Sequence, residues 1–227
     1  MKYISIDIET TGLDLETCQV LSIGAVIEDT GDIKPLDDLP TFHGVILARQ
    51  LSGQPYALNM NKDLIEAMVY YQTAEEDERI DLERLKGMKF YEKENIVEAF
   101  YYWLAGNGFV EFDDVNSGDY AKMENGKMVP TITNKTKPIH ITAAGKNFGT
   151  FDLKFLERLP RWKQLIKVRQ RILDPSILYV DWKKDESLPG LGLCKKRANL
   201  PEEVAHDAVE DAKDVILLLR KEYHSEH

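Results

Sequence analysis

The alternation over residues 3–8 constrains the fold of this chain more than any other feature of its sequence. Apolar side chains occupy every second position, and a period of two is typical of a β-strand with one buried face. The segment is therefore expected to form a strand that packs one face on a core and carries an acidic side chain on the other. The apolar positions are Ile4, Ile6 and Ile8, and the positions between or beside them are Tyr3, Ser5 and Asp7.

Other periodic segments along the chain predict further strands mixed with helices. This mixture indicates an α/β domain built in layers. Repeats, low-complexity tracts and interdomain linkers are absent from the sequence, so residues 1–227 are expected to form a single domain. The expected strands cover residues 19–28, 41–47, 139–144 and a short segment near 172–174. The expected helices cover residues 64–71 and 94–104, a segment from about residue 150, and a closing segment from about 207 to 223.

Residues 106–137 are expected to be an inserted loop or hairpin segment, because they are rich in Gly, Asn, Asp and Lys. Within them, Glu124-Asn125-Gly126-Lys127 stands between short apolar flanks. An Asn-Gly pair tolerates the positive φ angles of a type I′ turn, so this tetrapeptide predicts a hairpin. The role of the insertion stays open between a lid, a wall that excludes duplex and a dimer contact.

Composition excludes several classes of protein. Hydrophobic residues make up 43% of the chain, which is enough for a sizeable core, but they form no apolar run of the roughly 18 residues that a membrane helix needs. Asp7 interrupts the position where a signal peptide requires apolar residues. The two cysteines, Cys18 and Cys194, lack the C-x-x-C spacing of a zinc site or disulfide framework. A cytoplasmic protein without membrane association is therefore expected.

The charge of the chain is unevenly distributed. The formal net charge of −10 by itself argues against a nucleic-acid partner. Residues 146–200, however, contain thirteen Lys and Arg against six Asp and Glu. A local basic region attracts phosphates even on an acidic protein, although a solvated lysine-rich face explains the same pattern.

The first of three acidic motifs is Asp7-Ile8-Glu9-Thr10-Thr11-Gly12-Leu13. Residues two apart share a face of a strand, so the carboxylates of Asp7 and Glu9 point to one side. Two carboxylates this close raise each other's proton affinity unless a cation lies between them. The end of a strand is also where α/β sheets place their ligands. A solvated edge strand is the alternative interpretation.

The second motif runs from Asn147 through Phe148 to Asp152 and on to Leu156. On a helix that begins near Thr150, Asp152 shares a face with apolar side chains, where a carboxylate needs compensation such as a metal ion. The alternative is an ordinary first-turn Asp that interacts with the helix dipole, with Thr150 as the N-cap. The apolar residues on that face are Phe155, Leu156 and Leu159.

The third motif is His206-Asp207-Ala208-Val209-Glu210-Asp211-Ala212. It begins a helix with an apolar stripe in which alanines permit close approach to a sheet, and Asp211 lies on the flank of that stripe. We expect Asp207, Glu210 and Asp214 on the outer, solvated face. His206 has the alternative role of a capping or surface histidine. The stripe comprises Ala205, Ala208, Val209, Ala212, Val215, Ile216 and Leu219.

Taken together and in this order, the motifs resemble those of the DEDD superfamily of 3′–5′ exonucleases, which are DnaQ-like proteins with a ribonuclease H-like fold. The third motif has the histidine form, His-x4-Asp, which marks the DEDDh subclass. The resemblance covers roughly residues 1–29 and 138–223, and residues 45–137 match less well. It implies a mixed sheet flanked by helices, with the 106–137 segment inserted. The matching segments are D-I-E-T-T-G-L, N-F-G-T-F-D-L-K-F-L and H-D-A-V-E-D-A.

The resemblance also implies a site and a reaction. Two divalent cations, Mg²⁺ or Mn²⁺, would be held by four carboxylates, with a histidine as general base for phosphodiester hydrolysis. The metal ligands would be Asp7, Glu9, Asp152 and Asp211, and the base His206. The residues expected to contact substrate are Thr10, Gly12, Leu13, Asn147 and Phe148. Residues 56–61 resemble a segment that touches the terminal nucleotide in some members, and the basic residues 158–171 are further candidates for holding the strand.

The expected function is therefore a single-domain, metal-dependent 3′–5′ exonuclease that releases nucleoside 5′-monophosphates from single-stranded DNA or RNA. Several alternatives stay open. The same sequence is compatible with a proofreading subunit of a polymerase assembly, with a ribonuclease H-type endonuclease or, with less support, with an inactive nucleic-acid-binding module. The sequence leaves the choice of sugar undecided, and also whether the chain forms a homodimer or docks on a polymerase.

Overall fold

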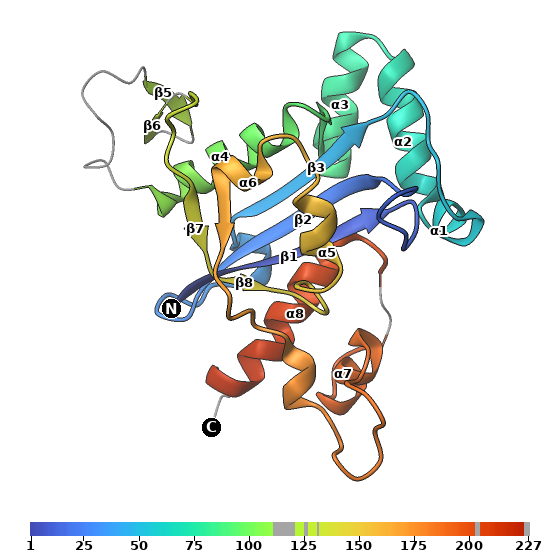
Figure 1. The fold of residues 1–227 in the computed structure, drawn as a ribbon, viewed down its shortest axis with the longest axis vertical. Coiled ribbons are helices and arrows are strands. Elements are labelled where there is room, and N and C mark those ends of the chain that lie inside the picture. Colours follow the sequence, from blue (N-terminus) through green and yellow to red (C-terminus); the bar gives the residue numbers. More distant parts are fainter. Residues whose placement is uncertain (111–120, 125–126, 131, 203–204, 225–227) are drawn as a thin grey trace.

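The computed structural model describes residues 1–110, 121–124, 127–130, 132–202 and 205–224. Its centre is a five-stranded mixed sheet with the strand order β4-β3-β2-β1-β8 (Figure 1). Strand β2 is antiparallel to both of its neighbours, whereas β4 runs parallel to β3 and β8 parallel to β1. The strands are β1 (Lys2–Thr10), β2 (Val20–Asp29), β3 (Thr41–Leu47), β4 (Lys89–Glu92) and β8 (Ala143–Ala144).

The alternation that predicted β1 is confirmed, since the two faces of this strand contact different layers. The isoleucine face packs on the main core, which helices α4 and α6 and the small parallel sheet β7–β9 complete. The opposite face, which begins with Tyr3, packs against helix α8. In Figure 1, α8 therefore lies across one face of the sheet and α4 and α6 across the other. These elements are α4 (Ile96–Leu104), α6 (Trp162–Leu165), α8 (Ala208–Tyr223), β7 (Ile139–Ile141) and β9 (Ile166–Val168).

A group of three helices follows β3 and covers the end of the sheet. The second of them packs Ala67 and Met68 against Leu21 and Val45 of the central strands. The third has no buried residue and is stabilised at its start by a capping box between Glu75 and Glu78. The helices are α1 (Pro55–Met60), α2 (Lys62–Thr73) and α3 (Glu76–Lys86).

The remaining elements are short and connect these layers. Helix α5 follows β8, α7 precedes the loop that leads to α8, and the β5–β6 hairpin lies in the insertion. Residues Asn125 and Gly126 of the expected turn lie outside the described residues, but Glu124 pairs with Lys127 as a hairpin there requires. These elements are α5 (Asp152–Leu156), α7 (Leu191–Arg197), β5 (Ala121–Glu124), β6 (Lys127–Pro130), and the single-turn segments Leu36–Asp38, Ala105–Phe109 and Pro175–Leu178.

Two expected strands differ from the structure. The strand predicted over 139–144 is divided, because Ile139–Ile141 pairs with β9 while Ala143–Ala144 joins β1 in the main sheet. The strand predicted near 172–174 is reduced to one bridge between Leu173 and Ala144. Both differences arise where the chain passes from one sheet to the other.

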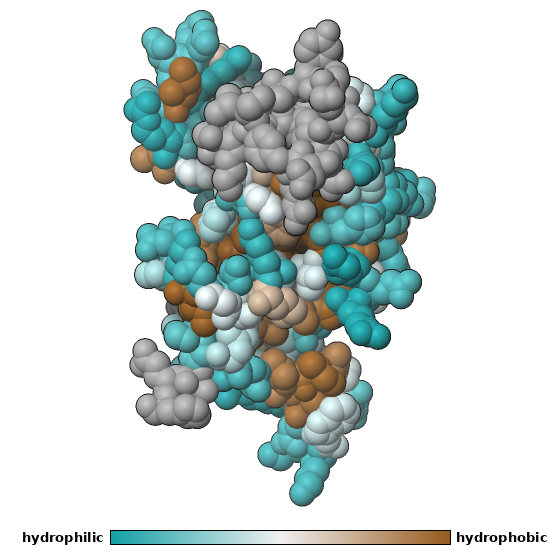
Figure 2. All heavy atoms as spheres, turned by 90° about the vertical axis from the view of Figure 1, so that its left-hand side faces the viewer, coloured by the Kyte–Doolittle hydropathy of each residue, from teal (hydrophilic) through white to brown (hydrophobic). Residues whose placement is uncertain are grey.

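Hydrophilic residues cover most of the described surface on the face that Figure 2 presents, and apolar residues form separate patches between them. Among the described residues, no helix combines the length and the apolar character needed to cross a membrane.

Candidate metal centre

Three carboxylates from two elements meet on the α8 side of the sheet. Asp7 and Glu9 lie two residues apart on β1, and Asp211 lies in the first turn of α8. Oxygen atoms of all three lie within 4.8 Å of one another. Asp211 Oδ1 is buried and has no hydrogen-bond partner in the described part of the chain. A set of carboxylate oxygens with one unsatisfied buried member fits a hard divalent cation such as Mg²⁺ or Mn²⁺.

Small residues at one contact bring Asp211 to the strand. Gly24 of β2 pairs with Asp7, and α8 begins directly over it. A Cβ at Gly24 would lie 2.2 Å from the carbonyl carbon of Ala208, so only glycine permits this approach. Ala208 and Ala212 are fully buried against the sheet, as the alanine stripe predicted, but Ala205 of that stripe is exposed and precedes the helix.

The first turn of α8 has a cap that the sequence reading did not predict. The Asp207 carboxylate accepts hydrogen bonds from the backbone N–H groups of Val209 and Glu210. The expectation of a solvated Asp207 is therefore wrong. The expectation for Asp214 is also wrong, because its carboxylate lies 2.5 Å from Nζ of Lys195, a buried side chain of α7. These contacts fix the start of the helix and hence the position of Asp211.

The fourth predicted ligand, Asp152 at the start of α5, is not part of the group of three whose oxygens all lie within 4.8 Å of one another. Asp152 is buried, which raises its pKa, and the backbone N–H groups of Ile8 and of Asp152 itself lower that pKa in part. Its charge is the largest of the neighbouring charges that raise the pKa of Asp7. Thr150 is not the N-cap that was expected, because its hydroxyl donates to the Asn147 carbonyl and Phe151 occupies the cap position.

Burial and mutual repulsion keep these carboxyl groups from ionising normally. Burial is the main cause of each shift, and it raises the pKa of Glu9 to about 8, of Asp152 to about 7 and of Asp211 to about 6. The pKa of Asp7 is raised well above its usual range by burial and then by the charges of Asp152, Asp211 and Glu9. Raised pKa values show that no positive charge among the neighbouring described residues balances these carboxylates. A bound cation would supply that charge.

His206 lies beside a cavity at the start of α8. It is exposed, adopts a left-handed conformation with φ of 51°, and immediately precedes the cap of α8. Together with Glu9 and Asn61 it lines a cavity of about 300 Å³. The Asn61 side chain lowers the pKa of Glu9, opposing the larger effect of burial, and its amide nitrogen donates to the backbone carbonyls of Thr10 at 3.3 Å and Ala57 at 3.1 Å. Asn61 was expected only as the end of a segment that touches the terminal nucleotide, and its effect on Glu9 was not predicted.

The residues expected to contact substrate lie in two different environments. Leu13 is 73% exposed on the loop after β1, where the Thr10 hydroxyl donates to the Gly12 carbonyl at 2.9 Å. Asn147 is exposed and has a positive φ. Phe148, by contrast, is only 1% exposed and packs in the main core. Its ring therefore offers no face for stacking on a base, contrary to expectation.

Structural comparison finds the same fold in a known nuclease. The structure of E. coli Exonuclease I in complex with a 5cy-dT13 oligonucleotide superposes with a TM-score of 0.53 and 14% sequence identity, covering 98% of this chain and 41% of that chain. This chain has the fold of exonuclease I. The dA16 complex of exonuclease I gives a TM-score of 0.53, 13% identity and coverage of 97% and 41%. The zinc-bound form of its single-stranded DNA complex gives a TM-score of 0.52 and 15% identity, and the match covers 98% of this chain and 41% of that chain.

The match to exonuclease I confirms the expected ribonuclease H-like fold over nearly the whole chain. The chain spans about 41% of the length of the exonuclease I chains that it matches. No protein-family model matches the sequence, and no curated protein matches it. The comparison therefore concerns the fold, and function has to be inferred from the site.

Proposed function

We propose that this chain is a single-domain, metal-dependent 3′–5′ exonuclease that hydrolyses the terminal phosphodiester of single-stranded nucleic acid and releases nucleoside 5′-monophosphates. The observation that carries the proposal is the cluster of Asp7, Glu9 and Asp211, with its unsatisfied Asp211 oxygen, on a fold shared with exonuclease I. A carboxylate cluster of this kind suits phosphoryl chemistry, in which charge develops on both the entering and the leaving oxygen.

Asp7, Glu9 and Asp211 would hold the cations, and Asp152 completes the set from the α5 side. When bound, two divalent cations neutralise charge on the phosphate and lower the pKa of the attacking water. The four carboxylates repel a polyanion when no cation is present. Metal binding should therefore precede productive binding of the substrate.

His206 would accept the proton from the attacking water. An imidazole is the side chain best suited to accept a proton near neutral pH, and His206 is exposed at the edge of the cluster where water has access. Its left-handed conformation next to the Asp207 cap holds the imidazole close to Asp211, whose pKa it lowers. Replacement by Ala is expected to reduce the rate by about 10²–10⁴-fold.

The 300 Å³ cavity beside Glu9 is where we place the nucleotide that leaves. Leu13 projects from the loop above the cluster and is available to pack against a base, while Thr10 and Gly12 shape that loop. Asn147 would contact the strand from the α5 side. Contacts of this kind are tolerant of sequence, so we expect degradation without base specificity.

The test is digestion of matched 5′-labelled and 3′-labelled single strands of DNA and RNA with Mg²⁺, Mn²⁺ or EDTA. The exonuclease I structures contain DNA oligonucleotides, which makes DNA the first substrate to try. We expect a metal-dependent ladder that shortens from the 3′ end, is lost in Asp7→Asn and persists in Asp81→Asn, which removes an exposed acid of α3. Internal cuts would indicate an endonuclease instead. An absence of cleavage on every substrate would leave a binding module or a subunit that needs a polymerase.

A further inference from the structure

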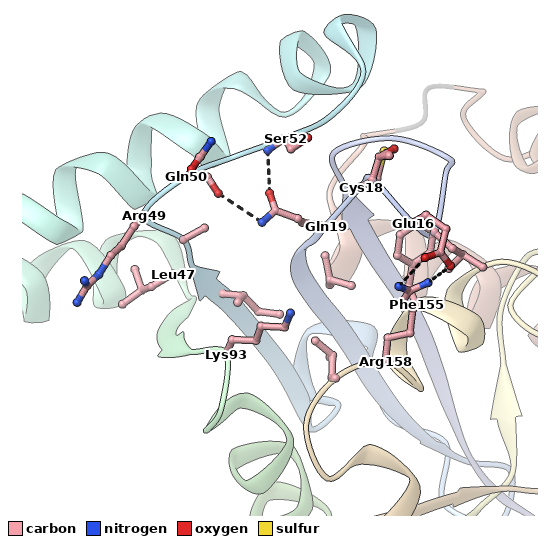
Figure 3. Close-up of a pocket in the computed structure, with 16 residues that line it drawn as sticks. Glu16, Cys18, Gln19, Leu47, Arg49, Gln50, Ser52, Lys93, Phe155 and Arg158 are labelled. Carbon is pink, nitrogen blue, oxygen red and sulfur yellow. Dashed lines mark hydrogen bonds and ion pairs between the residues drawn. The ribbon is translucent and has the colours of Figure 1, made fainter.

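A second, larger cavity lies beyond the end of β1. It is a groove of about 570 Å³ at the edge of the sheet where β1, β3 and β4 end (Figure 3). Carboxyl ends of strands are where α/β sheets bind ligands. The groove shares no lining residue with the cavity beside Glu9. Four segments line it: residues 15–20 after β1, residues 46–52 at the end of β3, Lys93 after β4, and the α5 region with Phe155, Arg158 and Leu159.

The charge of this groove is opposite to that of the whole chain. Its lining contains three cationic side chains, Arg49, Lys93 and Arg158, against the single carboxylate of Glu16, while the chain carries a net charge of −10. Among the described residues, no carboxylate forms an ion pair with Arg49 or Lys93. A concave surface with a local excess of positive charge concentrates anions.

The Arg158–Glu16 pair does not cancel this field. Arg158 Nη1 lies 2.7 Å from Glu16 Oε1, but the two side chains are 47% and 79% exposed. An ion pair so accessible to water contributes little, so a phosphate can replace Glu16 as the partner of Arg158 at small cost. Figure 3 shows this pair on one side of the groove, Arg49 on the opposite side and Lys93 between them.

The floor of the groove is apolar, and its rim is held rigidly. Val20, Ile46, Phe155 and Leu159 are buried beneath the charged side chains. Gln19 joins the two loops of the rim, because its amide donates to the Gln50 carbonyl at 3.3 Å and accepts from the Ser52 N–H at 2.9 Å. A small anion would not use an apolar floor. A nucleic-acid strand fits the groove better, because its phosphates match the cationic side chains and the faces of its bases match the apolar floor.

The α5 region connects the groove to the metal centre. Asp152 begins α5, while Phe155 and Arg158, three and six residues later, line the groove. The segment after β1 forms a second connection, because Glu9 near the end of that strand belongs to the carboxylate cluster and residues 15–20 line the groove. We propose that the groove binds the segment of single strand on the 5′ side of the scissile phosphate, with Arg49, Lys93 and Arg158 contacting its backbone phosphates. This inference rests on the proposed exonuclease function.

The test compares the double variant Arg49→Gln/Lys93→Gln with wild type and with Arg84→Gln/Lys183→Gln, which removes two exposed cations outside the groove. The steady-state constants are measured on a labelled 20-nucleotide strand and on a trinucleotide, from low to high salt. Each phosphate contact on a single strand contributes about 0.7 to the slope of log affinity against log salt, so the groove variant should lose about 1.4 from this slope. Its preference for the 20-mer over the trinucleotide should fall several-fold, whereas the control should match wild type.

Equal slopes and equal length preference in the groove variant, the control variant and wild type would overturn the inference. Thermal unfolding of each variant shows whether the fold is intact, and Arg158→Gln provides an independent third position. If wild type cleaves neither substrate, the exonuclease proposal fails by itself. Fluorescence anisotropy of the 20-mer with Mg²⁺ then tests binding in the groove separately. Equal affinity of the groove variant and wild type would refute this binding, and a loss of affinity in the groove variant alone would support it.

Discussion

Replacing Gly24 by Ala tests whether close approach of α8 to the sheet builds the metal centre. The new Cβ would lie 2.2 Å from the Ala208 carbonyl carbon, 2.4 Å from its oxygen and 2.5 Å from the Val209 nitrogen. All three are backbone atoms, so no side-chain rotation relieves the contact. To reach the 3.4 Å at which ordinary contact begins, the start of α8 has to retreat by about 1.2 Å.

The size of the effect follows from this displacement. Overpacking of a well-packed contact costs about 1–3 kcal/mol, which for a chain of this length lowers the melting temperature by about 2–12 °C. Asp211 moves with the helix, while Asp7 and Glu9 stay on the sheet. A misplacement of about 1 Å in a reacting constellation reduces the rate by about 10²-fold, so activity should fall more than the loss of stability explains.

The assay measures Mn²⁺ affinity by calorimetry, melting temperature, and release of nucleotides from a labelled single strand. Gly31→Ala is the matched control, because the nearest atom to a Cβ there is a side-chain oxygen of Asp29 at 3.4 Å. We expect the control to resemble wild type and Gly24→Ala to lose both Mn²⁺ affinity and rate. A Gly24→Ala protein with unchanged melting temperature and Mn²⁺ affinity would refute the idea that this contact positions Asp211.

Three further predictions concern the charges around the site. Without divalent cations, stability should decline as pH rises between about 4.5 and 8. The pKa of Glu9 is raised from 4.5 to about 8, so over this range the folded state keeps a proton that the unfolded state loses. Melting curves recorded in EDTA should show this decline, and Glu9→Gln should flatten it. Addition of Mg²⁺ or Mn²⁺ at 100 times its Kd should stabilise the protein by about 2.7 kcal/mol, or about 5–11 °C, and EDTA should reverse the shift. Lys195→Met leaves Asp214 buried without its partner and should lower the free energy of unfolding in urea by about 3–5 kcal/mol. The control Lys163→Met, at an exposed site, should lower it by less than about 0.5 kcal/mol. The double variant Lys195→Met/Asp214→Leu should recover much of the loss.

The strands of the sheet were predictable because their patterns are local. β1, β2 and β3 match the expected segments to within one or two residues, and β1 shows the expected division into an isoleucine face and a polar face. Helix α3 was not expected, since none of its residues is buried and it therefore has no apolar stripe to detect. Its sequence signal is the capping box of Glu75 and Glu78, which is polar and easily overlooked.

The carboxylates of the site were also predictable, but the reason they meet was not. Asp7 and Glu9 share a face of one strand, which the spacing alone predicts. Their contact with Asp211 depends on Gly24 and Ala208, which are far apart in the chain and ordinary when considered separately. Helical periodicity placed Asp214 on the outer face of α8, but α7 packs there and contributes Lys195. Packing partners between distant segments decide these positions, and a single sequence does not contain them in readable form.

Helix α8 carries one of the mutually repelling carboxylates, and contacts at its C-terminal end hold it to the sheet. Carboxylates on α8 and β1 repel each other across the contact at Gly24 when no cation is bound. Two buried interactions hold the last turns of α8 to the sheet: the Arg220 guanidinium donates to the fully buried Glu28 at 2.6 Å, and the hydroxyls of Tyr223 and Tyr3 lie 2.8 Å apart. A buried pair adds little net stability but is costly to break, so these contacts fix the position of the helix. Groups outside the cluster therefore fix the position of the carboxylate on α8 relative to those on β1.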